Sequence, residues 1–330
     1  MLSGLFRDLK PENIWLLTAI VSFVVTLAAL VFGRRILPKD QGREFAVNGA
    51  LSKGKARGAG MLLIVALILC TFLMVSVELE YIIYMAALFV EMMSGYLDDA
   101  AEKPWSELKK GIIDLVVSVA VSVTVYVFHG GAVYLPIIGV TFTLPAVIYV
   151  LLGVVLIWAS INVTNCADGV DGLCTSLSMV TLVTVLLILR GANAWIYQAY
   201  TESIGQVIWM MLFVLAAYLW FNCSPSSMLM GDAGSRPLGM LIAMGFMISG
   251  MPFLFIPGAL LLILDGGLGL LKLTVLRVTK SKTFMKNIRT PLHDHARKNK
   301  GWSDTQVVTR FTLLQLLISA AALLLAGLLP

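Results

Sequence analysis

The sequence predicts an all-α, polytopic membrane protein with about ten transmembrane helices that form one domain over residues 1–330. Apolar residues make up 59% of the chain and charged residues only 13%, whereas soluble domains carry about 25% charged residues. The apolar residues also gather in runs long enough to cross a bilayer, which takes roughly 17–25 residues. Lipid rather than water is therefore expected to surround much of this chain.

Ten apolar runs account for most of the sequence. They cover residues 14–32, 61–77, 81–97, 112–128, 144–161, 173–189, 204–221, 238–251, 253–276 and 311–329. The eighth run is short, and Gly250-Met251-Pro252 leaves room only for a tight reversal before the ninth. The ninth contains Pro257 and several glycines, so a bent or broken helix is expected there.

The loops between these runs differ in their basic residues. Nineteen of the 24 Lys and Arg residues lie in the first, third, seventh and ninth loops, the seventh contributing Arg236, whereas the even-numbered loops contain only Arg190. Short cytoplasmic loops are enriched in Lys and Arg, so the odd loops are predicted to be cytoplasmic and both termini external. Positive charge confined to such short loops does not support nucleic-acid binding.

Polar residues that are costly near a membrane fall almost entirely in these odd loops. They are Asp98 and Asp99 after the third run, Asn165, Asp168 and Asp171 before the sixth, Asn222 and Asp232 after the seventh, and His293 and His295 in the ninth loop. Ionisable residues at such depths tend to mark functional sites. Their common side predicts one active site on the cytoplasmic face.

Asp98 and Asp99 are adjacent carboxylates that repel each other, which a bound cation or a shared proton would relieve. Mg²⁺ prefers oxygen ligands and usually bridges one or two carboxylates to substrate phosphates. Two solvated aspartates at a helix end are the alternative interpretation. Because Asp232 is expected on the same face, a Mg²⁺ site is favoured.

The other motifs leave alternatives open. Asp168 and Asp171 can cap the sixth helix or accept a hydrogen bond from a nucleobase. Residues 230–235 predict a glycine-rich turn that opens the eighth helix and could hold phosphate. The basic loop around His293 and His295 is either an ordinary cytoplasmic loop or a clamp on a polyanionic substrate. Asp114 and Asp265 lie inside apolar runs, and their roles stay open.

These motifs, in this order, resemble those of the polyprenyl-phosphate N-acetylhexosamine-1-phosphate transferases, and among them the phospho-N-acetylmuramoyl-pentapeptide transferase branch. The matching segments are Asp98-Asp99, N-C-A-D-G-V-D-G-L from Asn165, F-N-C-S-P through M-G-D-A-G-S, and P-L-H-D-H followed by Gly301-Trp302. The resemblance spans about residues 58–310. The chain departs from it at Asp294, where the family has a histidine, at Leu229, where it has an aromatic residue, and at residues 53–60, which stand in place of the family's G-T-P-T-M-G-G.

The resemblance implies transfer of phospho-MurNAc-pentapeptide from UDP-MurNAc-pentapeptide to undecaprenyl phosphate, giving lipid I and UMP, by a homodimer in the cell inner membrane. It implies that Asp98, Asp99 and Asp232 are catalytic, with Asp232 as the main Mg²⁺ ligand and Asp99 beside it. The substrate-binding residues would be Lys110 near the donor phosphates, Asp168 and Asp171 near the uridine, Asn165 and Asn222 in support, and His293 and His295 on the donor.

Two other functions remain open from the sequence. A sister enzyme that transfers N-acetylglucosamine-1-phosphate or another UDP-hexosamine phosphate would use the same metal chemistry. An ion-coupled transporter would place its acids near the bilayer centre between inverted repeats, whereas these acids collect on one face and no repeat is visible. Direct attack by the lipid phosphate and a covalent phospho-aspartyl route both fit these residues.

Overall fold

The computed structural model describes residues 10–42, 52–76, 78–101, 103, 105–192, 201–280 and 283–329. Arg43 and Lys282, two of the basic residues counted in the odd loops, lie outside the described residues.

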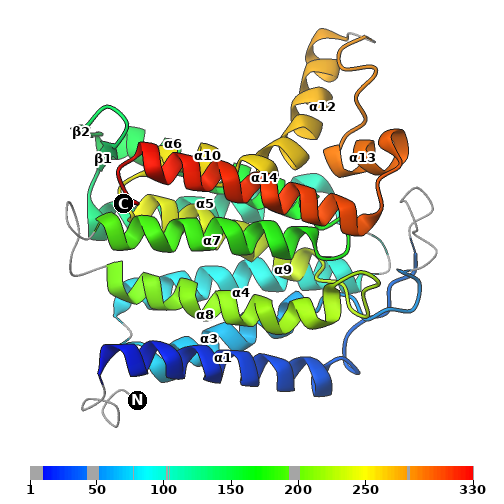
Figure 1. Ribbon diagram of the computed structural model, residues 1–330, viewed down its shortest axis with the longest axis horizontal. Helices are drawn as coiled ribbons and strands as arrows, with labels where there is room; N and C mark the ends of the chain where they lie inside the picture. The colour runs from blue at the N-terminus through cyan, green and yellow to red at the C-terminus, as the bar shows by residue number, and fades with distance from the viewer. Residues whose placement is uncertain are drawn as a thin grey trace.

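Long helices packed side by side form the body of the protein (Figure 1). Their bounds are α1 Pro11–Gly33, α3 Gly60–Met74, α4 Leu79–Ala100, α5 Glu107–His129, α6 Ala146–Ala167, α7 Leu173–Ala192, α8 Thr201–Asn222, α9 Asp232–Ile248 and α14 Asp304–Leu325. Each helix covers most of one predicted apolar run. A backbone in lipid must satisfy its own hydrogen bonds, which is why continuous apolar runs become helices.

Six of these helices, α1, α5, α6, α7, α8 and α14, are long and apolar enough to cross a membrane. Two others are short, with 15 residues in α3 and 17 in α9. Helix α4 has 22 residues but contains four carboxylates. The structure thus confirms a multi-pass helical membrane protein, while ten crossings stay a prediction.

The ninth apolar run is broken, as expected. It consists of η2 Pro252–Leu254, α10 Phe255–Gly258, α11 Leu260–Leu262, the π-helical η3 Ile263–Gly267 and α12 Leu268–Thr279. The parts before and after Ala259 are bent by 69° from each other. Figure 1 shows α12 projecting away from the bundle, and none of its residues is buried.

One element departs from the predicted all-α class. Strands β1 Ala132–Leu135 and β2 Val140–Thr143 pair as an antiparallel hairpin between α5 and α6. Gly139 allows the tight turn because its φ is 67°. The hairpin lies at the end of the bundle where α14 finishes, opposite the end that carries α13 Leu292–Lys300 (Figure 1).

Helix α9 is the centre of the bundle, since every residue from Ala233 to Ile248 is buried. Two neighbouring helices touch its backbone directly. A Cβ at Gly95 of α4 would lie 2.3 Å from the carbonyl carbon of Asp232, and a Cβ at Gly60 of α3 would lie 2.1 Å from the amide of Gly234. These close approaches place the start of α9 beside the end of α4.

The prediction that Arg236 lies in the seventh loop is wrong. Arg236 belongs to α9 and is only 3% exposed. A basic residue can lie inside the bundle when acids from other helices pair with it, and Glu91 and Asp114 do so.

Candidate active site

The polar residues singled out in the sequence lie at helix ends on one side of the bundle. Asp98 and Asp99 end α4, Asp168 caps the C-terminus of α6, Asn222 ends α8 and Asp232 begins α9. Contacts between these ends join them into a single cluster.

Lys110 is the cation at the centre of the cluster. It lies in the first turn of α5, which Ser106 caps by accepting a hydrogen bond from the Lys109 amide. Its Nζ is 3.3 Å from Oδ2 of Asp98 and 3.9 Å from Oδ2 of Asp232. One lysine therefore spans two of the three carboxylates predicted to be catalytic.

Asp99 is held by α9 and by the first loop of the chain, which joins α1 to α3 and is called loop one below. Its Oδ1 lies 2.9 Å from Nε of Arg57, and its Oδ2 accepts a hydrogen bond from the Ala233 amide at 3.3 Å. A Cβ at Gly231 would lie 2.1 Å from Asp99 Oδ2, and Gly231 has φ 70°. Both the lack of space and the positive φ therefore require glycine at this position.

The environment of Asp99 disfavours its negative charge. The residue lies beyond the predicted apolar run 81–97. Burial, together with the nearby Asp232 carboxylate, raises the pKa of Asp99 to about 6, although Arg57 and the Ala233 amide act in the opposite direction. A cation bound beside Asp232 would favour the ionised form of Asp99.

Loop one contributes two cations that the sequence analysis did not assign to the site. Lys55 Nζ lies 3.1 Å from Oγ of Ser226 and 3.8 Å from Oδ2 of Asp171. Arg57 pairs with Asp99 and also lies 3.9 Å from Asp40. The sequence feature that could have indicated them is Lys55-Ala56-Arg57, which lies where the chain departs from the family motif.

Backbone hydrogen bonds hold residues 56–60, at the end of loop one, against the segment that precedes α9. The Ala59 and Gly60 amides donate to the carbonyls of Leu229 and Met230, and the Leu229 amide donates to the carbonyl of Ala56. The end of loop one and the segment before α9 therefore lie side by side along the same edge of the site.

Asp168 and Asp171 bind backbone amides of the loop before α9. Asp168 Oδ2 accepts from the Gly231 amide at 3.0 Å, and Asp171 Oδ2 accepts from the Ser226 amide at 2.8 Å. Helix α7 begins only at Leu173. In this structure both carboxylates connect two loops, which differs from the helix-cap alternative considered for them.

The two asparagines strengthen the same connection. Asn165 Nδ2 donates to Oγ of Ser235 at 3.0 Å. Asn222 Oδ1 accepts from the Gly172 amide at 3.0 Å and from Oγ1 of Thr175 at 3.2 Å. Asn222 is buried, so these bonds hold the α6–α7 loop on the end of α8.

The two histidines are placed differently. His293 is buried, its amide donates to Oδ1 of Asp265 at 2.7 Å, and its Nδ1 lies 2.8 Å from Oδ2 of the same carboxylate. Its Nε2 packs on Gly169, where an added Cβ would be 2.5 Å away. His295 is half-buried, and its Nδ1 accepts from the Arg289 amide at 3.4 Å. The structure thus brings His293, but not His295, onto the aspartate loop.

The cluster fits a cation that the substrate helps to bind. Among the described residues there is no group of three or more His, Cys, Asp or Glu side chains suited to hold a metal. Mg²⁺ in phosphate-handling sites needs only one or two carboxylates, because phosphates and water supply its other ligands. Asp232, whose side chain is 17% exposed, is open to such an ion, with Asp99 beside it.

A bundle that contains six helices long and apolar enough to cross a membrane, with paired carboxylates and cations gathered at one of its ends, defines the class of this protein. It is a multi-pass membrane enzyme of the transferase type, with a site suited to anionic phosphate groups. Residues 81–250 match the model of glycosyl transferase family 4, and the chain belongs to that family.

Relatives of similar length support this membership. The phospho-N-acetylmuramoyl-pentapeptide-transferase of Treponema pallidum strain Nichols is 34% identical over 333 residues, which cover 97% of this chain and 92% of the relative. Proteins of the same name from Clostridium acetobutylicum and Wolinella succinogenes are 24% and 26% identical, each over 92% of both chains.

Proposed function

We propose that this chain transfers phospho-MurNAc-pentapeptide from UDP-MurNAc-pentapeptide to undecaprenyl phosphate, forming lipid I and releasing UMP in the first membrane step of peptidoglycan synthesis. The name shared by relatives that cover nearly the whole chain supports this reaction. The observation that carries it is Lys110 between Asp98 and Asp232. In this proposal Lys110 would lie between the phosphate of the lipid acceptor and the pyrophosphate of the donor.

The difficulty of this reaction is that acceptor and donor are both anions. Lys55, Arg57 and Lys110 supply fixed positive charge around the cluster. Asp232, with Asp99 beside it, would hold Mg²⁺, which when bound supplies charge neutralisation and orientation of the phosphates. Asp98 is oriented by the Trp105 amide at 2.6 Å as well as by Lys110, so we assign it to the side of the lipid phosphate.

The donor nucleotide is assigned to the joined loops. Asp168 and Asp171 lie on the α6–α7 loop, which Asn165 and Asn222 hold in place. His293 reaches the same loop at Gly169 from α13. We propose that the uridine binds along this loop and that its pyrophosphate extends towards Asp232. His295 is then a peripheral contact.

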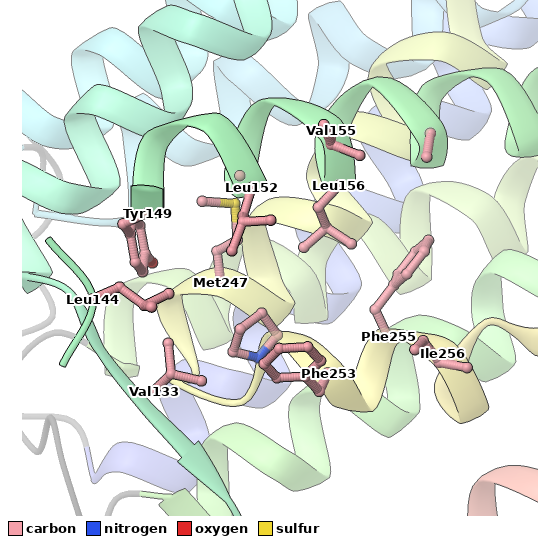
Figure 2. Close-up of a pocket in the computed structure, with 13 residues that line it drawn as sticks. Val133, Leu144, Tyr149, Leu152, Val155, Leu156, Met247, Phe253, Phe255 and Ile256 are labelled. Carbon is pink, nitrogen blue, oxygen red and sulfur yellow. The ribbon is translucent and has the colours of Figure 1, made fainter. Parts of the chain in front are cut away.

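An apolar cavity provides a place for part of the polyprenyl chain. Its volume is about 270 Å³, and Figure 2 shows Tyr149, Leu152 and Leu156 of α6 facing Met247 and Phe253 across it. Nine residues of α6 separate Leu156 from Asn165, a rise of about 14 Å. A long isoprenoid lying along α6 could therefore occupy the cavity while its phosphate reaches the cluster.

We further propose the orientation that the basic loops predict, with the carboxylate cluster facing the cytoplasm and both termini outside. Helix α1 begins and α14 ends at the end of the bundle opposite α13 (Figure 1), as an even number of crossings requires. The chain would form a single transmembrane domain with ten crossings, act as a homodimer and reside in the cell inner membrane.

The deciding experiment uses purified protein, undecaprenyl phosphate, Mg²⁺ and a panel of UDP-sugars, with release of UMP and formation of a lipid-linked product as readouts. Rapid turnover of UDP-MurNAc-pentapeptide is expected. The His293-Asp294-His295 sequence, where the family has three histidines, is the observation that favours a second candidate, a sister enzyme with another UDP-hexosamine. Preference for UDP-N-acetylglucosamine would establish that candidate instead.

A further inference from the structure

A second layer of charge lies beneath the carboxylate cluster, inside the bundle. Arg236 Nε is 3.0 Å from Oε1 of Glu91, and Arg236 Nη2 donates to Oδ1 of Asp114. Glu91 is 0% exposed, Arg236 3% and Asp114 4%. Nothing in the proposed reaction uses these three side chains.

The two layers are built from the same three helices. Asp114 follows Lys110 by four residues on α5, and Arg236 follows Asp232 by four residues on α9. Glu91 precedes Asp98 by seven residues on α4. Spacings of four and seven return to the same helix face after one and two turns. In each layer a cation from one of these helices therefore lies between carboxylates from the other two.

The inner layer is poorly explained as a source of stability. Removing ions from water is costly, and a buried ion network is often no more stable than apolar residues of the same volume. Within the described residues, Nη1 of Arg236 and Oε2 of Glu91 are buried without a hydrogen-bond partner, which adds to the cost. What such networks can supply is a fixed register between elements.

The register of α9 against α4 matters for the cluster. Gly95 lies between the two layers, with the α9 backbone at Asp232 so close that a Cβ would be 2.3 Å from it. A slip of α9 by one turn would move Asp232 by about 5.4 Å. That is more than its 3.9 Å separation from Lys110.

We propose that Glu91, Asp114 and Arg236 are positioning residues that set the register of α9 against α4 and α5, and so hold Asp98 and Asp232 within reach of Lys110. This inference rests on the proposed roles of Asp98 and Asp232. It assigns no contact with substrate to the inner layer.

The test replaces the whole inner layer with apolar residues, as Glu91→Leu, Asp114→Leu and Arg236→Met together. No uncompensated charge remains buried, so the variant is expected to melt at or above the wild-type temperature. Its kcat should nevertheless fall by about 10-fold to 100-fold, because small misplacements of reacting groups have effects of that size. The concentration of Mg²⁺ that gives half-maximal activity should rise, with a smaller change in donor KM.

The matched control removes a buried pair from two of these helices, α4 and α5, at their opposite ends. His129 Nε2 of α5 lies 2.5 Å from Oε1 of Glu80 of α4, and both residues are buried. The Glu80→Gln, His129→Gln variant should lose stability but keep its kcat and its Mg²⁺ dependence. Wild-type kcat and Mg²⁺ dependence in the folded triple variant would overturn the proposal.

If the triple variant does not fold, Arg236→Lys decides the question. Lysine keeps the charge but lacks the guanidinium fork that reaches both acids, so the same shifts in kcat and Mg²⁺ dependence are expected, and wild-type values would again overturn the proposal. Binding of Mn²⁺ in the presence of the UDP-linked donor, measured by electron paramagnetic resonance and compared with the donor alone, distinguishes failure of the metal assignment from failure of the positioning role. Wild-type protein that binds no Mn²⁺ would contradict the metal role of Asp232, whereas wild-type Mn²⁺ affinity and kcat in the variants would contradict only the positioning layer.

Discussion

Arg57 Nε lies 2.9 Å from Oδ1 of Asp99, so a side chain of the first loop pairs with the acidic motif at the end of α4. Its neighbour Asp98 is paired with Lys110 in the same way. The two adjacent carboxylates therefore do not rely on a metal alone for compensation. Among the described residues, Asp232 has a single ion-pair contact, with Lys110 at the longer distance of 3.9 Å, and it is the carboxylate most open to an added cation.

Arg57→Ala should lower kcat/KM for the UDP-linked donor by about 10-fold to 100-fold, because Asp99 loses the cation that favours its ionised form and fixes its position. Arg57→Lys should restore part of the loss. Arg35→Ala removes an exposed cation from the same loop and serves as the control. Undiminished kcat/KM in Arg57→Ala would show that the pair with Asp99 has no part in the reaction.

Asp232→Asn should nearly abolish turnover and Mn²⁺ binding while leaving the melting temperature in detergent close to that of the wild type. Asp98→Asn should abolish turnover but retain most of the metal affinity, because its carboxylate is occupied by Lys110 and the Trp105 amide. Turnover and Mn²⁺ titration are measured on the same preparations. Full wild-type activity in excess EDTA would refute the metal assignment.

His293→Ala should impair turnover strongly, and His295→Ala only mildly. His293 is fixed on two sides by Asp265 and Gly169, whereas His295 contacts the Arg289 amide within its own loop. Steady-state kcat/KM for UDP-MurNAc-pentapeptide and UDP-N-acetylglucosamine, compared in both variants, tests donor discrimination at the transition state. Equal losses in the two variants would contradict this difference in roles.

Ala159→Phe should fill part of the apolar cavity and raise the KM for undecaprenyl phosphate several-fold, with little change in donor KM. Ala159 lines the cavity, and a larger side chain there competes for the volume. Val147→Phe is the control, because Val147 lies on the same helix but is 70% exposed. A rise in donor KM alone would place the lipid elsewhere.

Single cysteines at Arg35, Ser227 and Lys286, introduced into a cysteine-free background, should be accessible only from the cytoplasm. Cysteines at Ile137 in the hairpin and at Gly327 should be accessible from outside. The reason is the excess of basic residues in the odd loops. Labelling of intact cells and of inverted vesicles with an impermeant maleimide measures this. External labelling at Lys286 would reverse the proposed orientation.

The membrane class, the helix positions and the break in the ninth run followed from local sequence. Each has a local cause, because a backbone in lipid must bond to itself and because Pro257 has no amide proton to donate. The positions of the motifs in odd-numbered loops also sufficed to predict that their residues lie at one end of the bundle. These properties depend on nearby residues and on the alternation of the loops between two sides.

The charge pairs were decided by the tertiary structure alone. From the sequence alone Arg236 falls in a loop, because it lies between the apolar runs 204–221 and 238–251. Glu91 and Asp114 from two other helices nevertheless make its burial in the bundle tolerable. Asp265 pairs with His293 because α13 packs against η3, and Arg57 pairs with Asp99 because loop one packs against the start of α9. Neither pairing can be read from the sequence. Such pairs form only where helix faces and loops far apart in the chain meet, and no local pattern encodes which of them will.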